Sequence, residues 1–123
     1  LVGKYPQKRF IFTVSPIRHL KDGAHGNQIS KSTLLMAVDS VVENHPDQCA
    51  YFPAYEIMMD ELRDYRFYAE DMVHPSQQAV NYIWERFCDF ALPETERATL
   101  EKNRKAFLQS QHRIITKSQN TDK

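Results

Sequence analysis

An aspartate and a histidine three residues apart, Asp71 and His74, have the types and spacing that hydrolytic chemistry uses. A carboxylate that accepts a hydrogen bond from one imidazole nitrogen fixes the tautomer of the ring. The other nitrogen is then free to take a proton from a nucleophile. Pro75 disfavours helical geometry at His74 and suits the first position of a helix. The motif therefore predicts a general base and its orienting carboxylate at the end of a loop, with a surface ion pair or a helix cap as the alternative.

Ser15 is the best candidate for a nucleophile within the chain, because it ends a predicted strand. Pro16 follows it and lacks the backbone N–H that an oxyanion hole takes from the residue after a nucleophile, so a place in a substrate loop suits Ser15 better. Arg18 and His19 lie just beyond the same strand, at the end where open α/β sheets bind ligands. We expect them to contact an anionic or sugar-like group, and a solvated loop is the alternative.

Hydrophobic periodicity predicts the elements that position these residues. Runs rich in β-branched and aromatic residues over 9–14 and 48–52 indicate two short strands, and apolar residues at helical spacing over 30–44 indicate a helix between them. Asp-Gly and Gly-Asn pairs over 21–28 predict a loop ahead of this helix. A strand, a helix and a strand in this order imply a right-handed parallel crossover.

The second half of the chain is predicted to be helical. Apolar residues indicate a short helix over 55–62 and, after a loop over 63–70, a strongly amphipathic helix from about 76 to 90. This second helix should pack on the core and hold the preceding loop in place. Pro93 separates it from a polar helix over about 94–112, and residues 118–123 should fray.

Composition excludes several classes of function. The 123 residues include 16 basic and 16 acidic side chains, so charge does not direct the protein to nucleic acid or to an anionic membrane. No apolar run approaches the roughly 20 residues that span a bilayer. The histidines lack the ligand spacing of zinc motifs, and we expect neither a metal nor a cofactor. Two cysteines, Cys49 and Cys88, are too few for a disulfide framework and fit a reducing, cytoplasmic setting.

Three segments resemble the C-terminal part of a GSCFA-family protein, a branch of the SGNH hydrolase superfamily. They are Phe12-Thr13-Val14-Ser15-Pro16-Ile17-Arg18-His19, Tyr51-Phe52-Pro53-Ala54-Tyr55-Glu56 and Asp71-Met72-Val73-His74-Pro75. The resemblance implies an α/β fold: the C-terminal part of a flavodoxin-like three-layer α/β/α SGNH hydrolase with a parallel sheet, followed by a polar C-terminal helix. Residues 1–92 would form the hydrolase part, and residues 93–123 a peripheral helical tail.

The same resemblance implies a function. Asp71 matches the orienting carboxylate and His74 the general base of a serine-dependent ester hydrolase or acyltransferase, while Ser15 matches a strand end that lines the cleft. The substrate would be a small-molecule or carbohydrate ester. The GSCFA block and the glycine and asparagine blocks of the family are absent, which places the serine upstream of Leu1. We therefore expect a C-terminal fragment that is inactive alone, because it lacks most oxyanion donors.

A second function class stays open. Two parallel strands make a small sheet with unpaired edges, and the helices carry apolar faces. Such a chain can act as a non-catalytic α/β interaction module that binds a protein partner or self-associates as a homodimer.

Overall fold

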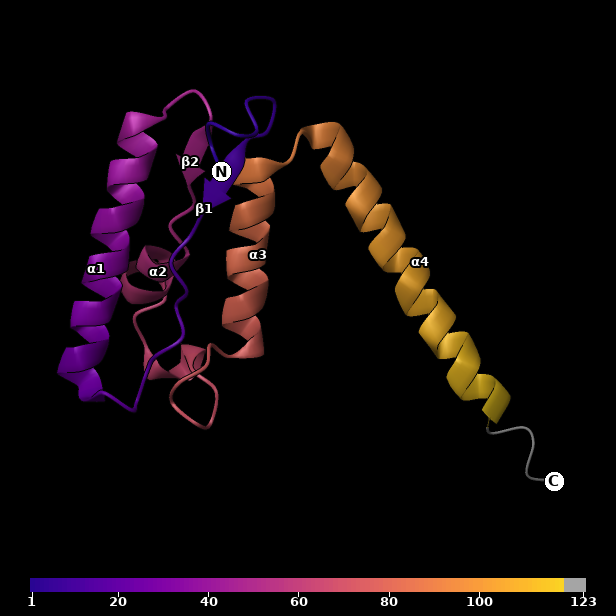
Figure 1. Cartoon of the computed structure of the whole chain (residues 1–123). Helices are drawn as coiled ribbons and strands as arrows, with labels where there is room; N and C mark the ends of the chain where they lie inside the picture. Colours follow the sequence, from indigo (N-terminus) through magenta and orange to yellow (C-terminus); the bar gives the residue numbers. More distant parts are fainter. Residues whose placement is uncertain (119–123) are drawn as a thin grey trace. The chain divides into compact units, whose positions relative to one another are not determined.

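The computed structural model describes residues 1–118, with side chains as far as residue 111 (Figure 1). The fold is mixed α/β, mostly helical, with one parallel sheet of two strands. The chain divides into two compact units, Leu1–Phe87 and Cys88–Lys123, here called unit 1 and unit 2. The division falls within a helix.

The sheet consists of β1 (Phe10–Phe12) and β2 (Cys49–Tyr51), which pair in parallel with Phe10 opposite Cys49. The two predicted strands and their parallel pairing are confirmed, although each strand is shorter than its hydrophobic run. Pairing ends where the N–H of Phe52 donates to the carbonyl of Phe12 at 2.8 Å. Pro53 follows without an N–H group, so the ladder cannot continue.

The helix between the strands, α1 (Gly23–Asn44), begins earlier than the sequence indicates, and the predicted loop over 21–28 is wrong. The glycines that suggested turns serve the helix instead. Gly23 has a φ of 70°, which lets the chain turn into the helix without a side-chain clash. A Cβ atom at Gly26 would lie 2.8 Å from that of Asp22, so glycine permits a close approach there.

The predicted short helix over 55–62 is present but irregular. It begins as α2 (Ala54–Glu56) and continues as a π-helical segment, η1 (Ile57–Glu61), in which the N–H of Leu62 donates to the carbonyl of Ile57 at 2.9 Å. The core of unit 1 forms around this turn and consists of Phe52, Ala54, Ile57, Met58, Leu62 and Ala79. Met58, at the centre of this core, is fully buried.

The strongly amphipathic helix is α3 (Gln77–Ala91). It begins after Ser76, whose Oγ accepts the N–H of Ala79 at 3.2 Å. The prediction that Pro75 occupies the first helical position is therefore wrong. Pro75 instead forms an isolated antiparallel bridge with Tyr68. Ser76 precedes the helix and caps it, because its hydroxyl can accept a free N–H of the first turn.

The loop between the core turn and α3 contains one 3-10 turn, η2 (Tyr65–Phe67), and is otherwise irregular, as predicted over 63–70. Within unit 1 the strands lie between α1 and α3 (Figure 1). The predicted α/β class is confirmed, and the flavodoxin-like three-layer architecture stays a prediction.

Unit 2 contains the end of α3 and the helix α4 (Glu94–Ser118), which is longer than the predicted 94–112. Arg97 bonds to the carboxylates of Asp89 and Glu94 within this unit. The predicted fraying of 118–123 falls almost wholly outside the described residues. No helix within residues 1–118 is long and apolar enough to cross a membrane.

Candidate functional site

The Asp71 and His74 side chains are in contact. Nδ1 of His74 lies 2.6 Å from Oδ2 of Asp71, and Oδ1 of Asp71 accepts the N–H groups of Val73 at 2.9 Å and His74 at 3.0 Å. With the carboxylate ionised, Nδ1 of the neutral ring donates the hydrogen bond, so Nε2 keeps its lone pair. This is the tautomer that a general base requires.

Hydrogen bonds keep Asp71 ionised. The backbone N–H groups of His74 and Val73, followed by the imidazole of His74, lower the pKa of the Asp71 carboxyl to about 2. The two side chains are 49% and 58% exposed for Asp71 and His74, so water screens the attraction between their charges. The directed hydrogen bonds, rather than burial, therefore hold the pair.

Backbone hydrogen bonds close the loop that carries the pair. The N–H of Ala69 donates to the carbonyl of His74 at 2.8 Å, and the N–H of Ser76 donates to the carbonyl of Phe67 at 2.7 Å. Met72, near the tip, has a φ of 60° and donates its N–H to the carbonyl of Ala69 at 2.9 Å. A left-handed conformation at a residue other than glycine is strained, and such strain is common at functional loops.

Arg18 is the predicted site residue that reaches this loop. Its backbone N–H donates to the carbonyl of Val73 at 3.2 Å. Its guanidinium carbon lies 4.2 Å from the ring centroid of Tyr68 and 5.8 Å from that of Tyr65. Stacking on the rings restricts a long side chain that would otherwise be mobile. The strand-end loop and the Asp71–His74 loop are therefore neighbours.

Two adjoining hollows in unit 1 share Arg18, Met59 and Tyr65, and have volumes of about 210 and 330 Å³. The larger one is also lined by His19, whose backbone N–H donates to Oδ1 of Asn27 at 2.9 Å. Its size lies at the lower end of the range of ~300–1,000 Å³ that small-molecule sites occupy. Two of the predicted substrate-binding residues thus line one hollow.

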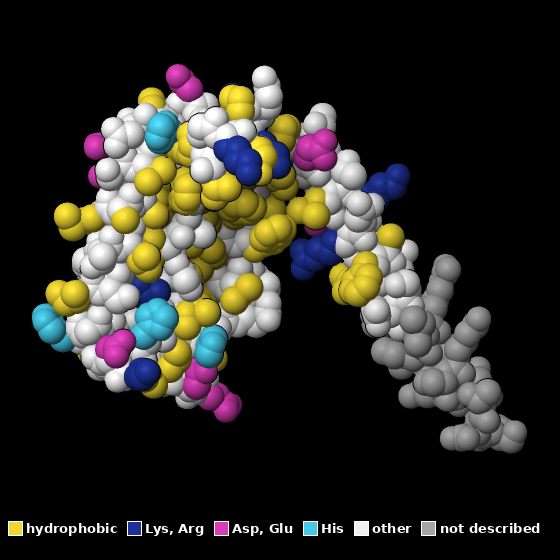
Figure 2. All heavy atoms as spheres, viewed as in Figure 1, with side chains coloured by type: hydrophobic (Ala, Val, Ile, Leu, Met, Phe, Trp, Pro, Cys, Tyr) yellow, Lys and Arg dark blue, Asp and Glu magenta, His cyan; other side chains and the backbone are white. Residues whose placement is uncertain are grey.

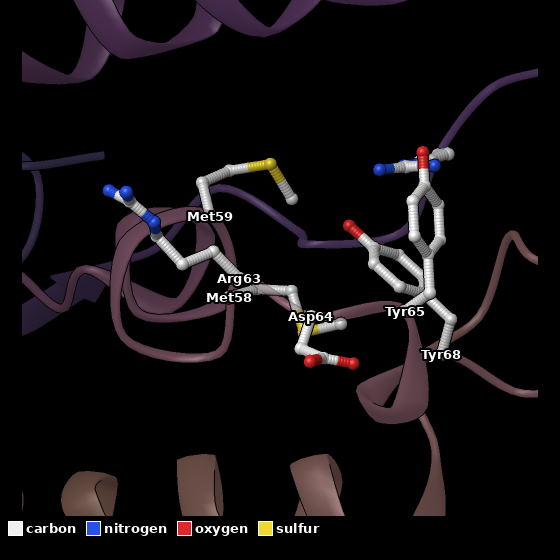
Figure 3. A pocket seen from close by; sticks show the side chains of 7 residues that line it. Met58, Met59, Arg63, Asp64, Tyr65 and Tyr68 are labelled. Atoms are coloured by element: carbon white, nitrogen blue, oxygen red, sulfur yellow. The ribbon is translucent and has the colours of Figure 1, made fainter.

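The smaller hollow is shown in Figure 3. The rings of Tyr65 and Tyr68 lie side by side at one end, and Arg63 extends away from them. The carboxylate of Asp64 turns away from the phenol oxygens and accepts the backbone N–H of Arg66 at 2.9 Å. The aromatic end of this hollow is therefore free of that carboxylate.

Ser15 lines neither hollow. Its Oγ accepts the N–H of Ile17 at 3.3 Å, and its carbonyl accepts a hydrogen bond from Nζ of Lys31 at 2.5 Å. Lys31 is 1% exposed, and burial lowers the pKa of its ammonium group. The structure thus brings Arg18 and His19 together but leaves Ser15 apart, on a bend that Lys31 supports.

His74 lacks a nucleophile partner in the part of the chain whose side chains are described, residues 1–111. Its only side-chain hydrogen bond there is to Asp71, and no hydroxyl or thiol is bonded to Nε2. In the same residues, no three His, Cys, Asp or Glu side chains gather closely enough to hold a metal ion. Alone, the Asp71–His74 pair can accept a proton, and the hollows reach its loop through Arg18.

Family comparison confirms the GSCFA part of the resemblance noted for the three segments. The model of the GSCFA family matches residues 1–87. The chain belongs to the GSCFA family. No curated protein and no solved structure matches it. The GSCFA match ends at the same residue as unit 1, so the family region of this chain is one compact unit that contains the Asp71–His74 loop.

Three residues around the larger hollow of this GSCFA chain were not singled out from the sequence. Asn27 and Gln28 stood in the predicted loop, and Tyr55 counted as part of an apolar helix face. In the structure Tyr55 donates its hydroxyl hydrogen to Oε1 of Gln28 at 2.8 Å. Asn27 and the buried Lys31 are four residues apart on α1, which places them on one helix face. That spacing could have indicated a helix face with polar residues, but the glycines around it were interpreted as turns.

Proposed function

We propose that this GSCFA chain supplies the general base, His74, and its orienting carboxylate, Asp71, to a serine-dependent ester hydrolase or acyltransferase of the SGNH type. The substrate is a small-molecule or carbohydrate ester. The observation that carries the proposal is the 2.6 Å contact between Nδ1 of His74 and Oδ2 of Asp71, made while Oδ1 is held by two backbone N–H groups.

The reaction follows the usual acyl-transfer sequence. The serine proton passes to Nε2 of His74 as the serine oxygen attacks the ester carbonyl. The C–O bond to the leaving alcohol then breaks, and the imidazolium returns the proton to that alcohol. Water or an acceptor alcohol next loses its proton to Nε2 and attacks the acyl-serine, which releases the acid or the new ester. Asp71 stabilises the imidazolium in both halves.

The serine lies outside these 123 residues in this proposal. Two observations support this placement: Nε2 of His74 has no hydroxyl partner within residues 1–111, and neither outer edge of the β1–β2 sheet is paired in the described residues. A larger parallel sheet of the flavodoxin-like three-layer type would cover an edge and bring a serine from another strand. Unit 1 is then the C-terminal part of that domain.

Labelling by an alkyl fluorophosphonate tests the function on the native polypeptide that carries these residues. We expect covalent labelling of one serine. The His74→Ala substitution should slow it by about 10²–10⁴-fold, the usual contribution of a general base. His25→Ala is the control, because His25 is an exposed histidine of α1 outside both hollows.

The isolated 123-residue chain provides the complementary test. We expect it to hydrolyse 4-nitrophenyl acetate no faster than free imidazole does, since it has no serine at His74. Enzymatic turnover by this chain that disappears in His74→Ala would refute the placement of the serine. Absence of serine labelling in the native polypeptide would refute the function itself.

A self-associating interaction module is the second candidate, and an apolar hollow in unit 1 favours it. The hollow has a volume of about 350 Å³ and lies between the strand ends and α3, where it includes Phe52, Val80 and Trp84. Trp84 is 51% exposed although it is large and apolar. Figure 2 shows hydrophobic side chains gathered in the region of the strands. Exposed apolar patches of this kind mark protein interfaces.

Sedimentation velocity over a range of concentrations tests the module. A homodimer that Trp84→Asp dissociates would support it, with Ile29→Asp as a control because Ile29 is an exposed residue of α1 outside the apolar hollow. A monomer at every concentration would remove this candidate.

A further inference from the structure

Two side-chain amides that line the larger hollow, those of Asn27 and Gln28, have free hydrogen-bond donors. Oδ1 of Asn27 accepts the backbone N–H of His19, and Oε1 of Gln28 accepts the hydroxyl of Tyr55. Both amide oxygens are therefore engaged within the protein. No hydrogen bond involves Nδ2 of Asn27 or Nε2 of Gln28 in the described part of the chain, so each amide keeps two donors for a ligand.

Arg18 adds a charged donor to the same hollow. Its guanidinium lies over Tyr68, with 4.2 Å between the guanidinium carbon and the ring centroid. No hydrogen bond involves the guanidinium in the described part of the chain, so its N–H groups keep their capacity to donate to a ligand. No carboxylate lies within ion-pair distance of Arg18 among the side chains of residues 1–111. A fixed cation without an anionic partner is the feature that an anionic ligand recognises.

The shape of the donors distinguishes between anions. One planar guanidinium matches a carboxylate, which it binds with two parallel hydrogen bonds. Tyr65, which lines both hollows and is 65% exposed, offers an aromatic face beside Arg18. A sugar ring has an apolar face for such a surface and hydroxyl oxygens for the two amides. The combination fits a sugar acid better than a bare acid or an uncharged sugar.

We propose that the hollow binds the carboxylate of an acylated sugar acid, with Arg18 as the residue that determines this specificity. The proposal rests on the proposed function, since it names the substrate class of the same site. The link is the hydrogen bond from the Arg18 N–H to the carbonyl of Val73, which places this residue against the Asp71–His74 loop. The hollow and the Asp71–His74 loop therefore meet at Arg18.

Titration of the ¹⁵N-labelled chain with methyl glucuronide and with methyl glucoside tests the proposal by NMR. The two probes differ in charge and share the sugar ring. We expect the glucuronide to bind at least about tenfold more tightly, the preference that a hydrogen-bonded ion pair provides. The side-chain amide signals of Asn27 and Gln28 and the Nε–H signal of Arg18 should shift together. Inorganic phosphate at equal concentration should displace the glucuronide poorly.

Substitutions assign the preference to one residue. Arg18→Ala should remove most of the discrimination between the two probes, and Arg18→Lys should keep part of it as a point charge. Arg66→Ala is the matched control: Arg66 stacks on Phe67 in the neighbouring turn and lines neither hollow. A normal backbone spectrum for each variant shows that it is folded.

Equal binding of the two probes, binding of neither, or a preference that survives Arg18→Ala would overturn the substrate class. Phosphate that binds as tightly as the glucuronide would also overturn it, because the hollow would then be a general anion site. None of these readouts requires turnover. Glucuronide binding without serine labelling in the native polypeptide would instead support the sugar-acid site and refute the hydrolase function.

Discussion

Asp71 accepts three hydrogen bonds from groups within three residues of it along the chain. Because every partner is local, the contact depends on the conformation of one short loop rather than on distant packing. Lys31 is the opposite case. It is buried against the carbonyl of Ser15, sixteen residues away, and no local sequence pattern predicts that contact. The two charged groups therefore respond to pH for different reasons.

The Asp71 carboxyl should titrate at an unusually low pH. Its pKa is lowered to about 2, so the hydrogen-bonded loop favours the ionised form. The stabilisation from these bonds is complete above the unfolded pKa of about 3.9 and is lost as the pH falls toward 2. Carboxyl ¹³C NMR should show Asp71 still ionised at pH 3. A midpoint near 3.9 would mean that the three hydrogen bonds do not persist in solution.

Lys31 should make stability rise at alkaline pH. Burial lowers its pKa below the ordinary 10.5, so the unfolded state binds the proton more tightly than the folded state. The free energy of unfolding therefore increases with pH between the folded pKa and 10.5. Urea unfolding of the parent chain and of Lys31→Met, compared at several pH values, should show a difference that shifts in favour of lysine as the pH rises. A constant difference would contradict the lowered pKa.

The element that positions the site is α3, together with the residues just before it. Ser76 caps the helix with its side chain and bonds to the carbonyl of Phe67 through its backbone, so it joins the helix to the Asp71–His74 loop. Ala79, fully buried, and Phe87, whose ring meets that of Phe52 edge-on at 5.2 Å, fasten the helix to the core. The loop is therefore held at its C-terminal end by a packed element.

Removing the cap should weaken this connection. Ser76→Ala deletes the acceptor for the Ala79 N–H and should lower the free energy of unfolding by about 1 kcal/mol. Ser76→Asp, which preserves an acceptor at the helix N-terminus, should lose much less. Urea denaturation monitored by Trp84 fluorescence measures both. Equal losses in the two variants would show that the cap is not the cause.

The molecule as a whole has more apolar surface than its own elements cover. The two strands have unpaired edges in the described residues, and α1 leaves Leu34 and Met36 47% and 76% exposed. The apolar side chains of that helix are therefore only partly covered by the other described residues. This surplus is the observation on which both the larger domain and the interaction module depend.

Unit 1 should keep its fold without the C-terminal helix. Its core cluster lies wholly between Phe52 and Ala79, and the family match ends at residue 87. A chain that stops after Leu92 retains all of α3 and should unfold at the same urea concentration as the full chain. A substantially lower midpoint would show that residues 93–123 stabilise the family region.

Much of the fold follows from local patterns. Strands β1 and β2 and helix α3 lie where the hydrophobic periodicity predicts them. An element that buries one face needs apolar residues at the spacing of that face. The start of α1 was predicted wrongly, because a glycine occurs both in turns and in helices where another side chain approaches closely. The second case applies to Gly26, which Asp22 approaches. The sequence did not predict the π-helical segment η1 either, because its hydrogen bonds shift by one residue without changing the apolar pattern.

The sequence alone determined the Asp71–His74 contact, since a spacing of three residues and a following proline restrict the loop; the catalytic role of the pair stays a prediction. Only the tertiary structure decided that Arg18 lies against Val73 and Tyr68. It also decided that Ser15 lies apart from the hollows and that Lys31 is buried. Contacts between residues far apart in the chain depend on how the core packs, and no short-range pattern encodes that packing.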